Sequence, residues 1–150
     1  MKKMSKRIIK ALKKIGLYSN TSKTKDCIMI STREINVKEI EKTINIIFEV
    51  NKHGYIAHGI LNEFTVQKQN LTFVSQLCMH INSMHIFPFL VVNSGDVMYI
   101  DCQIYCNKFG IIKHVSNEEI VVTASAIMNH YKKYGKKLVD TSIMLTDTKK

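Results

Sequence analysis

Apolar and polar side chains alternate along residues 97–106. Successive side chains of a β-strand point to opposite faces of its sheet, so this period of two predicts a strand with one buried face. The buried face is expected to hold Met98, Ile100, Cys102, Ile104 and Cys106. The opposite face would present Tyr99, Asp101, Gln103 and Tyr105, either as a surface that binds another protein or as a face that is solvated or paired across strands.

The rest of the chain combines strand and helix signals. An apolar run at residues 86–92 leads through Asn93-Ser94-Gly95-Asp96 into this strand, which is a hairpin signal. A further strand is expected at residues 27–35, and two short strands with a turn at residues 55–69. Capping residues and apolar residues at helical spacing predict four helices, at residues 4–15, 37–53, 71–84 and 117–134.

These elements predict an α+β fold, a single small domain with a mainly antiparallel sheet flanked by about three helices, plus a basic N-terminal helix. The 150 residues suit one hydrophobic core. The expected division is a basic amphipathic arm and linker at residues 1–25, the α+β domain at residues 26–135 and a polar C-terminal tail at residues 136–150. The chain shows no internal repeat.

Positive charge is concentrated near the N-terminus. Residues 1–25 hold nine Lys or Arg and no acid, whereas residues 26–150 hold thirteen basic and twelve acidic residues. In the predicted helix, apolar residues form one stripe, and the residues expected to meet an anionic partner are Lys6, Arg7, Lys10, Lys13 and Lys14. The alternatives are nucleic acid, an anionic membrane surface, an acidic protein, or a helix that packs on the domain with its lysines in solvent.

The sequence predicts no catalytic site, cofactor or metal centre. Cys102 and Cys106 are four residues apart, with His80, His85 and His114 as the nearest further candidates for zinc, but on a strand both thiols point into the core. Cys78 and His80 diverge on a helix, so they form no nucleophile and base pair. The six glycines are scattered singly and make no phosphate loop.

The order of elements from residue 37 to residue 134 resembles the YbjN family, whose fold is similar to that of the type III secretion chaperones. The resemblance rests on the helix end at Asn82, on Phe87-Pro88 entering the next strand, on the Ser94-Gly95-Asp96 turn and on Ser116-Asn117-Glu118-Glu119 opening the last helix. It implies a small, often dimeric, non-enzymatic protein that binds or regulates other proteins.

The expected function is therefore a protein-interaction module, chaperone-like or regulatory, whose partner is another protein or a second copy of the chain. The alternative is a nucleic-acid-binding accessory protein that uses residues 2–25. The longest apolar runs are too short to span a bilayer, and lysines interrupt the N-terminal apolar residues of any export signal. The expected location is the cytoplasm, where four irregularly spaced cysteines stay reduced.

Overall fold

The computed structural model describes residues 1–85, 87–107 and 115–144, and it confirms the α+β class. The described strands form one antiparallel sheet in the order β1-β2-β4-β5-β7-β6, and β3 also pairs with β4. The strands are β1 (Ser19–Lys23), β2 (Ile28–Thr32), β3 (Ile35–Val37), β4 (Lys42–Val50), β5 (Gly54–Leu61), β6 (Phe89–Ser94) and β7 (Val97–Asn107). The helices are α1 (Lys2–Lys14), α2 (Leu71–Met84) and α3 (Asn117–Ile143), with short 3-10 turns at Lys38–Ile40 and Lys68–Asn70.

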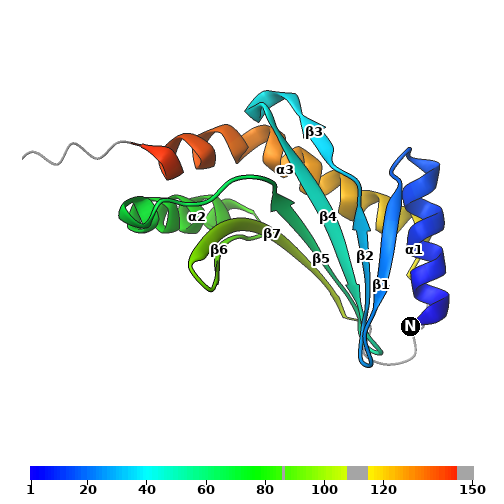
Figure 1. The fold of residues 1–150 in the computed structure, drawn as a ribbon. Coiled ribbons are helices and arrows are strands. Elements are labelled where there is room, and N and C mark those ends of the chain that lie inside the picture. Colours follow the sequence, from blue (N-terminus) through cyan, green and yellow to red (C-terminus); the bar gives the residue numbers. More distant parts are fainter. Residues whose placement is uncertain (86, 108–114, 145–150) are drawn as a thin grey trace, which may run out of the picture.

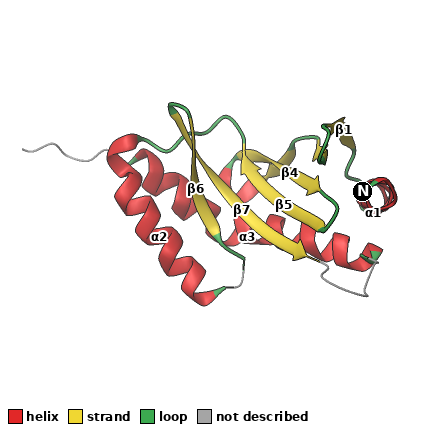
Figure 2. Cartoon of the chain, turned by 90° about the horizontal axis from the view of Figure 1, so that it is seen from below, coloured by secondary structure: helices red, strands yellow, loops and turns green. Residues whose placement is uncertain are grey.

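The three helices lie on one face of the sheet (Figures 1 and 2). The long helix α3 crosses the sheet behind β5 and β7, while α1 and α2 lie at opposite sides of the molecule. The core forms between α3 and the inward side chains of the strands, and in β4 these are Ile44, Ile46, Phe48 and Val50. The other face of the sheet carries no helix from the described part of the chain.

The helix predicted at residues 37–53 is wrong, because this segment contains a 3-10 turn and the strand β4. Its isoleucines match a helical spacing and a period of two at the same time. Burial in β4 alternates strictly, so each second side chain enters the core and the others face away from it. The β-branched residues of Thr43-Ile44-Asn45-Ile46-Ile47 favour this extended form, and Asn36 makes no helix cap.

Three other boundaries differ from the sequence prediction. Residues 55–69 contain one strand, β5, and the Asn62–Glu63 pair follows its end. The expected linker contains the strand β1, which pairs with β2, and the strand expected at residues 27–35 divides into β2 and β3. In the expected tail, α3 continues through Gly135 to Ile143. Gly135 packs directly against Ile40, and a Cβ atom at position 135 would approach the Cγ2 methyl of Ile40 to 2.8 Å, which accounts for a glycine inside the helix. Residues 145–150 of that tail lie outside the described part.

The remaining predictions of secondary structure are confirmed. α2 occupies residues 71–84, and β6 and β7 form the predicted hairpin, although Ile86 at its start lies outside the described residues. α3 begins where expected, and the Oγ of Ser116 accepts a 3.0 Å hydrogen bond from the backbone N–H of Glu119. This bond satisfies one of the free amides at the start of the helix.

Gly59 allows α3 to lie directly on β5. A Cβ atom at this position would overlap the Cγ2 methyl of Ile127 and lie 3.1 Å from Cε2 of Tyr131. We expect Gly59→Ala to lower the free energy of unfolding by about 1–3 kcal/mol through overpacking, measured by urea denaturation. In an Ile127→Ala background the overlapping methyl is gone, so the same substitution should cost less; an equal cost in both backgrounds would contradict the packing argument.

Candidate functional site on the helix-free sheet face

The helix-free face is formed by alternate residues of four neighbouring strands. The registers place Glu49 opposite Ile56, His58 opposite Gln103, and Ile60 opposite Asp101. Because side chains on paired residues share a face, these groups extend away from α3 together. The central residues of this face are Ile47, Glu49, Ile56, His58, Ile60, Leu90, Val92, Tyr99, Asp101, Gln103 and Tyr105.

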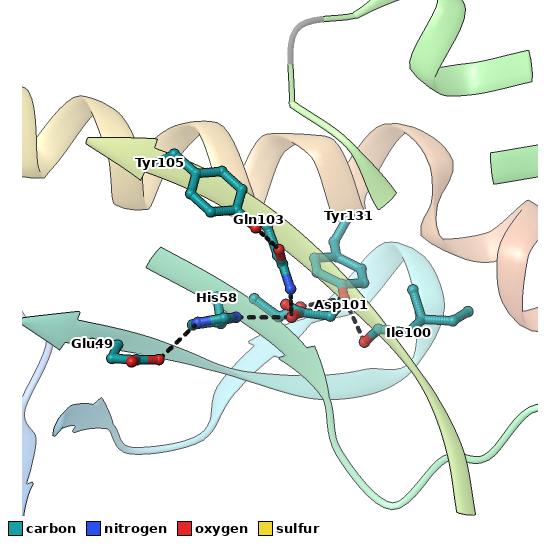
Figure 3. A network of polar contacts seen from close by, with 8 residues as sticks. Glu49, His58, Ile100, Asp101, Gln103, Tyr105 and Tyr131 are labelled. Atoms are coloured by element: carbon teal, nitrogen blue, oxygen red, sulfur yellow. Dashed lines mark hydrogen bonds and ion pairs between the residues drawn. The ribbon is translucent and has the colours of Figure 1, made fainter. Parts of the chain in front are cut away.

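A connected polar network crosses this face from β4 to β7 (Figure 3). Nδ1 of His58 lies 2.8 Å from Oδ2 of Asp101, and the same oxygen accepts a 2.8 Å hydrogen bond from Nε2 of Gln103. The hydroxyl of Tyr105 donates to Oε1 of Gln103 at 2.6 Å. At the other end, Nε2 of His58 lies 3.7 Å from Oε2 of Glu49. The imidazole is thus held between two carboxylates.

The network shifts the pKa of His58. The hydrogen bond to Asp101 raises this pKa above its ordinary value, burial lowers it, and the charges of Asp101 and Glu49 raise it further. The net direction is upward, because both neighbouring carboxylates favour the imidazolium form.

Asp101 is 2% exposed although no helix from the described residues covers this face. Among the described residues, Oδ2 of Asp101 has two hydrogen-bond partners, whereas its buried Oδ1 has none. A buried carboxylate oxygen without a partner loses its solvation, and no hydrogen bond from the described residues replaces it here.

The four residues predicted as a binding face do lie on it, but they are not equivalent. Asp101, Gln103 and Tyr105 belong to the network, whereas Tyr99 lies opposite Val92 of the neighbouring strand β6. Asp101 is paired across strands with His58, which is one of the expected alternatives, and it is buried.

Two members of the network were missed by the sequence analysis. Glu49 lies in the segment for which a helix was predicted and β4 is found, and His58 of β5 was not among the predicted site residues. The alternation of buried residues from Ile44 to Val50 is the signal that could have placed Glu49.

Apolar side chains surround this network. Ile47, Ile56 and Ile60 are half-buried, and Leu90 is 37% exposed. Tyr105, at the end of the network, is 58% exposed. The face therefore combines a fixed polar centre with accessible apolar and aromatic surface.

The predicted basic helix is confirmed as a helix, but its apolar stripe is part of the core. Ile8, Ala11 and Leu12 are 0% exposed, and α1 contacts α3 and the first two strands. Arg7, one of the predicted anion-binding residues, donates a 2.7 Å hydrogen bond to the carbonyl oxygen of Val115. The other predicted residues are exposed and remain accessible to a partner: Lys6, Lys10, Lys13 and Lys14.

The thiols inside the core are held in their protonated form. Burial raises the pKa of Cys78 to about 11, and burial with the nearby charge of Asp101 raises that of Cys102 to about 12. Cys106 was predicted in the core with Cys102 but is half-buried, and its thiol donates to Oε1 of Glu119 at 2.8 Å.

Two histidines share an open aromatic pocket between α2 and α3. The ring centroids of His85 and His130 are 5.1 Å apart, and His130 stacks on Phe89 at 4.9 Å. Burial and the neighbouring His85 lower the pKa of His130. Over residues 1–85, 87–107 and 115–144, no three His, Cys, Asp or Glu side chains are grouped so that they could hold a metal ion. His114, named above as a candidate ligand, lies outside these ranges.

Comparisons with protein-family models, curated proteins and solved structures found no match for this chain. No helix in the described part of the chain is both long enough and apolar enough to cross a membrane.

The raised pKa of His58 predicts a pH dependence of stability. An unfolded histidine titrates near pH 6.5, so protonated His58 stabilises the fold below that pH, and the contribution is lost as the pH rises through the higher folded pKa. We expect His58→Gln to lower the free energy of unfolding most at pH 6, with a gap to the unsubstituted protein that narrows towards pH 9. Urea denaturation across this range measures the gap, and a gap that does not change with pH would contradict the prediction.

Proposed function

We propose that the protein is a non-enzymatic interaction module that holds another protein on its helix-free sheet face. The observation that carries the proposal is the contact of half-buried His58 with buried Asp101 within accessible apolar surface. A chaperone-like or regulatory process in the cytoplasm fits such a module.

The chemistry of the face defines what it would bind. Apolar side chains of the partner would cover Ile56, Ile60 and Leu90, where burial of apolar area drives association. The hydroxyl of Tyr105 and the carboxylate of Glu49, at the two ends of the network, are accessible enough to form directional contacts. In protein–protein interfaces, aromatic and apolar residues beside a few fixed polar groups typically contribute most of the binding energy.

Site-specific photo-crosslinking tests this proposal. A photoreactive amino acid at Tyr105 should form discrete adducts with a partner protein in the source cell, because this side chain is 58% exposed on the proposed face. The matched control is the same amino acid at Val122, which is 63% exposed on α3, on the helical side of the molecule.

The adducts at Tyr105 should decrease at least about tenfold when Ile56→Glu places a charge in the apolar surround, since a buried unpaired charge costs more than the 1.4 kcal/mol that a factor of ten represents. Circular dichroism checks that this variant is folded. Identical adducts at Tyr105 and Val122, or adducts that Ile56→Glu leaves unchanged, would exclude this face as the binding surface.

We propose nucleic-acid binding through α1 as the second candidate function. Lys6, Lys10 and Lys14 follow one another at four-residue intervals, about 6 Å apart along the helix, with Lys13 beside them. Since Ile8 and Leu12 are buried against the body, α1 has little apolar surface left to enter a bilayer, which favours phosphate groups in solution over a membrane. An acidic protein surface would meet the same lysines.

Salt dependence tests this second function. Substituting Lys6, Lys10, Lys13 and Lys14 by Gln should reduce the slope of log K against log salt by about 3, because each phosphate contact contributes about 0.7–0.9. The matched control removes four exposed lysines of α3, namely Lys132, Lys133, Lys136 and Lys137. Fluorescence anisotropy with random duplex and single strands measures both variants, and equal losses or absent binding would exclude a specific role of α1.

A further inference from the structure

Within the described residues, the paired strand positions on the helix-free face include acids but no Lys or Arg. The central residues of this face, given above, contain Glu49 and Asp101 as their acids. Towards the β1 edge, the positions in register with this face are Asn20, Ser22, Met29 and Ser31. The chain holds 22 Lys and Arg and has a net charge of +10, so the face is opposite in sign to the molecule as a whole.

The lysines of the described strands lie on the other side of the sheet. Lys23 of β1 and Lys42 of β4 are in register with Ile28 and Val37, whose side chains are buried in the core. Because paired residues share a face, both lysines belong to the helical side. The exposed lysines of α1 and α3 lie on that side as well (Figure 2). The sheet thus separates these lysines from the polar network.

The polar network has a net negative charge in both protonation states of His58. Glu49 and Asp101 contribute two carboxylates, and the imidazole between them contributes at most one positive charge. The side chain of Glu49 is 38% exposed, against 17% for His58 and 3% for Asp101, so the charge that a partner meets first is that of Glu49. A phosphate or carboxylate of a partner would meet this charge with no lysine or arginine on the paired strand positions to offset it.

The network also has more capacity to accept hydrogen bonds than to donate them. Both imidazole nitrogens of His58 face carboxylates, and the hydroxyl of Tyr105 already donates to Gln103. Within the described residues, the groups left as acceptors are the Glu49 carboxylate, the Tyr105 oxygen and the buried Oδ1 of Asp101. Gln103 keeps one amide N–H as a donor. A partner that complements this surface therefore supplies mainly donors.

Glu49, Ile56 and Tyr105 form one row across β4, β5 and β7 (Figure 3). Neighbouring strands are about 4.8 Å apart, so the backbones at the two ends of the row are about 10 Å apart. A guanidinium group pairs with a carboxylate through two parallel hydrogen bonds, and it also stacks on aromatic rings. The row offers a carboxylate at one end, a phenol ring at the other and apolar surface between them. Arginine flanked by apolar residues matches this order of groups.

We propose that the protein held on this face presents a cationic segment, with an arginine or lysine opposite Glu49 and apolar residues over Ile56 and Ile60. The inference rests on the proposed function and names the chemistry of its partner. The net charge of +10 opposes the approach of such a segment, but at physiological ionic strength exposed charges more than about 8 Å apart are largely screened. The charges of the face itself therefore decide the contact, and anionic partners are directed to the lysines of α1.

Charge reversal at Glu49 tests the proposal in the full chain. A photoreactive amino acid at Leu90, which is 37% exposed on the same face, forms adducts in the source cell and leaves Glu49 and Tyr105 intact. The adducts are compared with those of Glu49→Gln, which removes the charge, and of Glu49→Lys, which reverses it. The matched control is Glu118→Lys, the same reversal at an exposed position on α3.

We expect about threefold fewer adducts for Glu49→Gln, at least about tenfold fewer for Glu49→Lys and no change for the control, because reversal adds repulsion to the loss of an ion pair. Circular dichroism identifies a misfolded Glu49→Lys variant, in which case Glu49→Gln decides. Mass spectrometry should find arginine or lysine in the cross-linked partner segment. Adducts that Glu49→Lys leaves unchanged or increases, or a cross-linked segment that is acidic or belongs to a second copy of this chain, would overturn the proposal.

The outcome is separable from that of the proposed function. Adducts that Ile56→Glu removes but Glu49→Lys leaves unchanged would keep this face as the binding surface and refute the cationic partner. An absence of adducts at both Leu90 and Tyr105 would instead refute the binding surface itself.

Discussion

The contact of α3 with β5 organises the molecule, because it places the helical layer on one face of the sheet. The buried hydroxyl of Tyr131 donates to the carbonyl oxygen of Gly59 at 2.5 Å and also lies 3.2 Å from that of Ile100. Burial raises the pKa of this phenol well above its ordinary value, so the group remains a hydrogen-bond donor at physiological pH. Because α3 covers the inner face of β5 and β7, the side chains on their outer face form the polar network and are accessible to the partner proposed above.

The sequence was sufficient to predict an element where its apolar residues fitted only the period of a strand or only the period of a helix. In β7, polar residues between the apolar ones fit only a strand, and in α2 the buried positions Val74, Cys78 and Ile81 fit only a helix. Residues 37–53 carried apolar residues at both spacings, so cap residues decided the prediction and decided it wrongly. The outcome depended on neighbouring strands, since β4 pairs with β2, β3 and β5 and its extended form is fixed by those ladders.

The candidate site was predictable only in part, because the pairing register of the strands brings its residues together. The alternation of β7 placed Asp101, Gln103 and Tyr105 on one face, but nothing local in the sequence aligns His58 with Gln103 or brings Glu49 to the other side of the imidazole. The basic helix shows a similar limit. Its amphipathic pattern was correct, yet the pattern alone did not reveal that Ile8 and Leu12 would pack on the body, which turns an expected arm into part of the fold.

The His58–Asp101 pair is difficult to explain by folding alone. Burying a carboxylate beside a half-buried imidazole removes both groups from water, and well-packed apolar residues at such positions often hold a protein together equally well. Here one carboxylate oxygen also lacks a partner within the described residues. The neighbouring isoleucines show that this face accepts apolar side chains, so a polar pair at its centre is consistent with the proposed binding role. A partner that covers Ile56 and Ile60 would further exclude water from the His58–Asp101 pair. The fixed orientation of the pair would then determine which partner surfaces can bind.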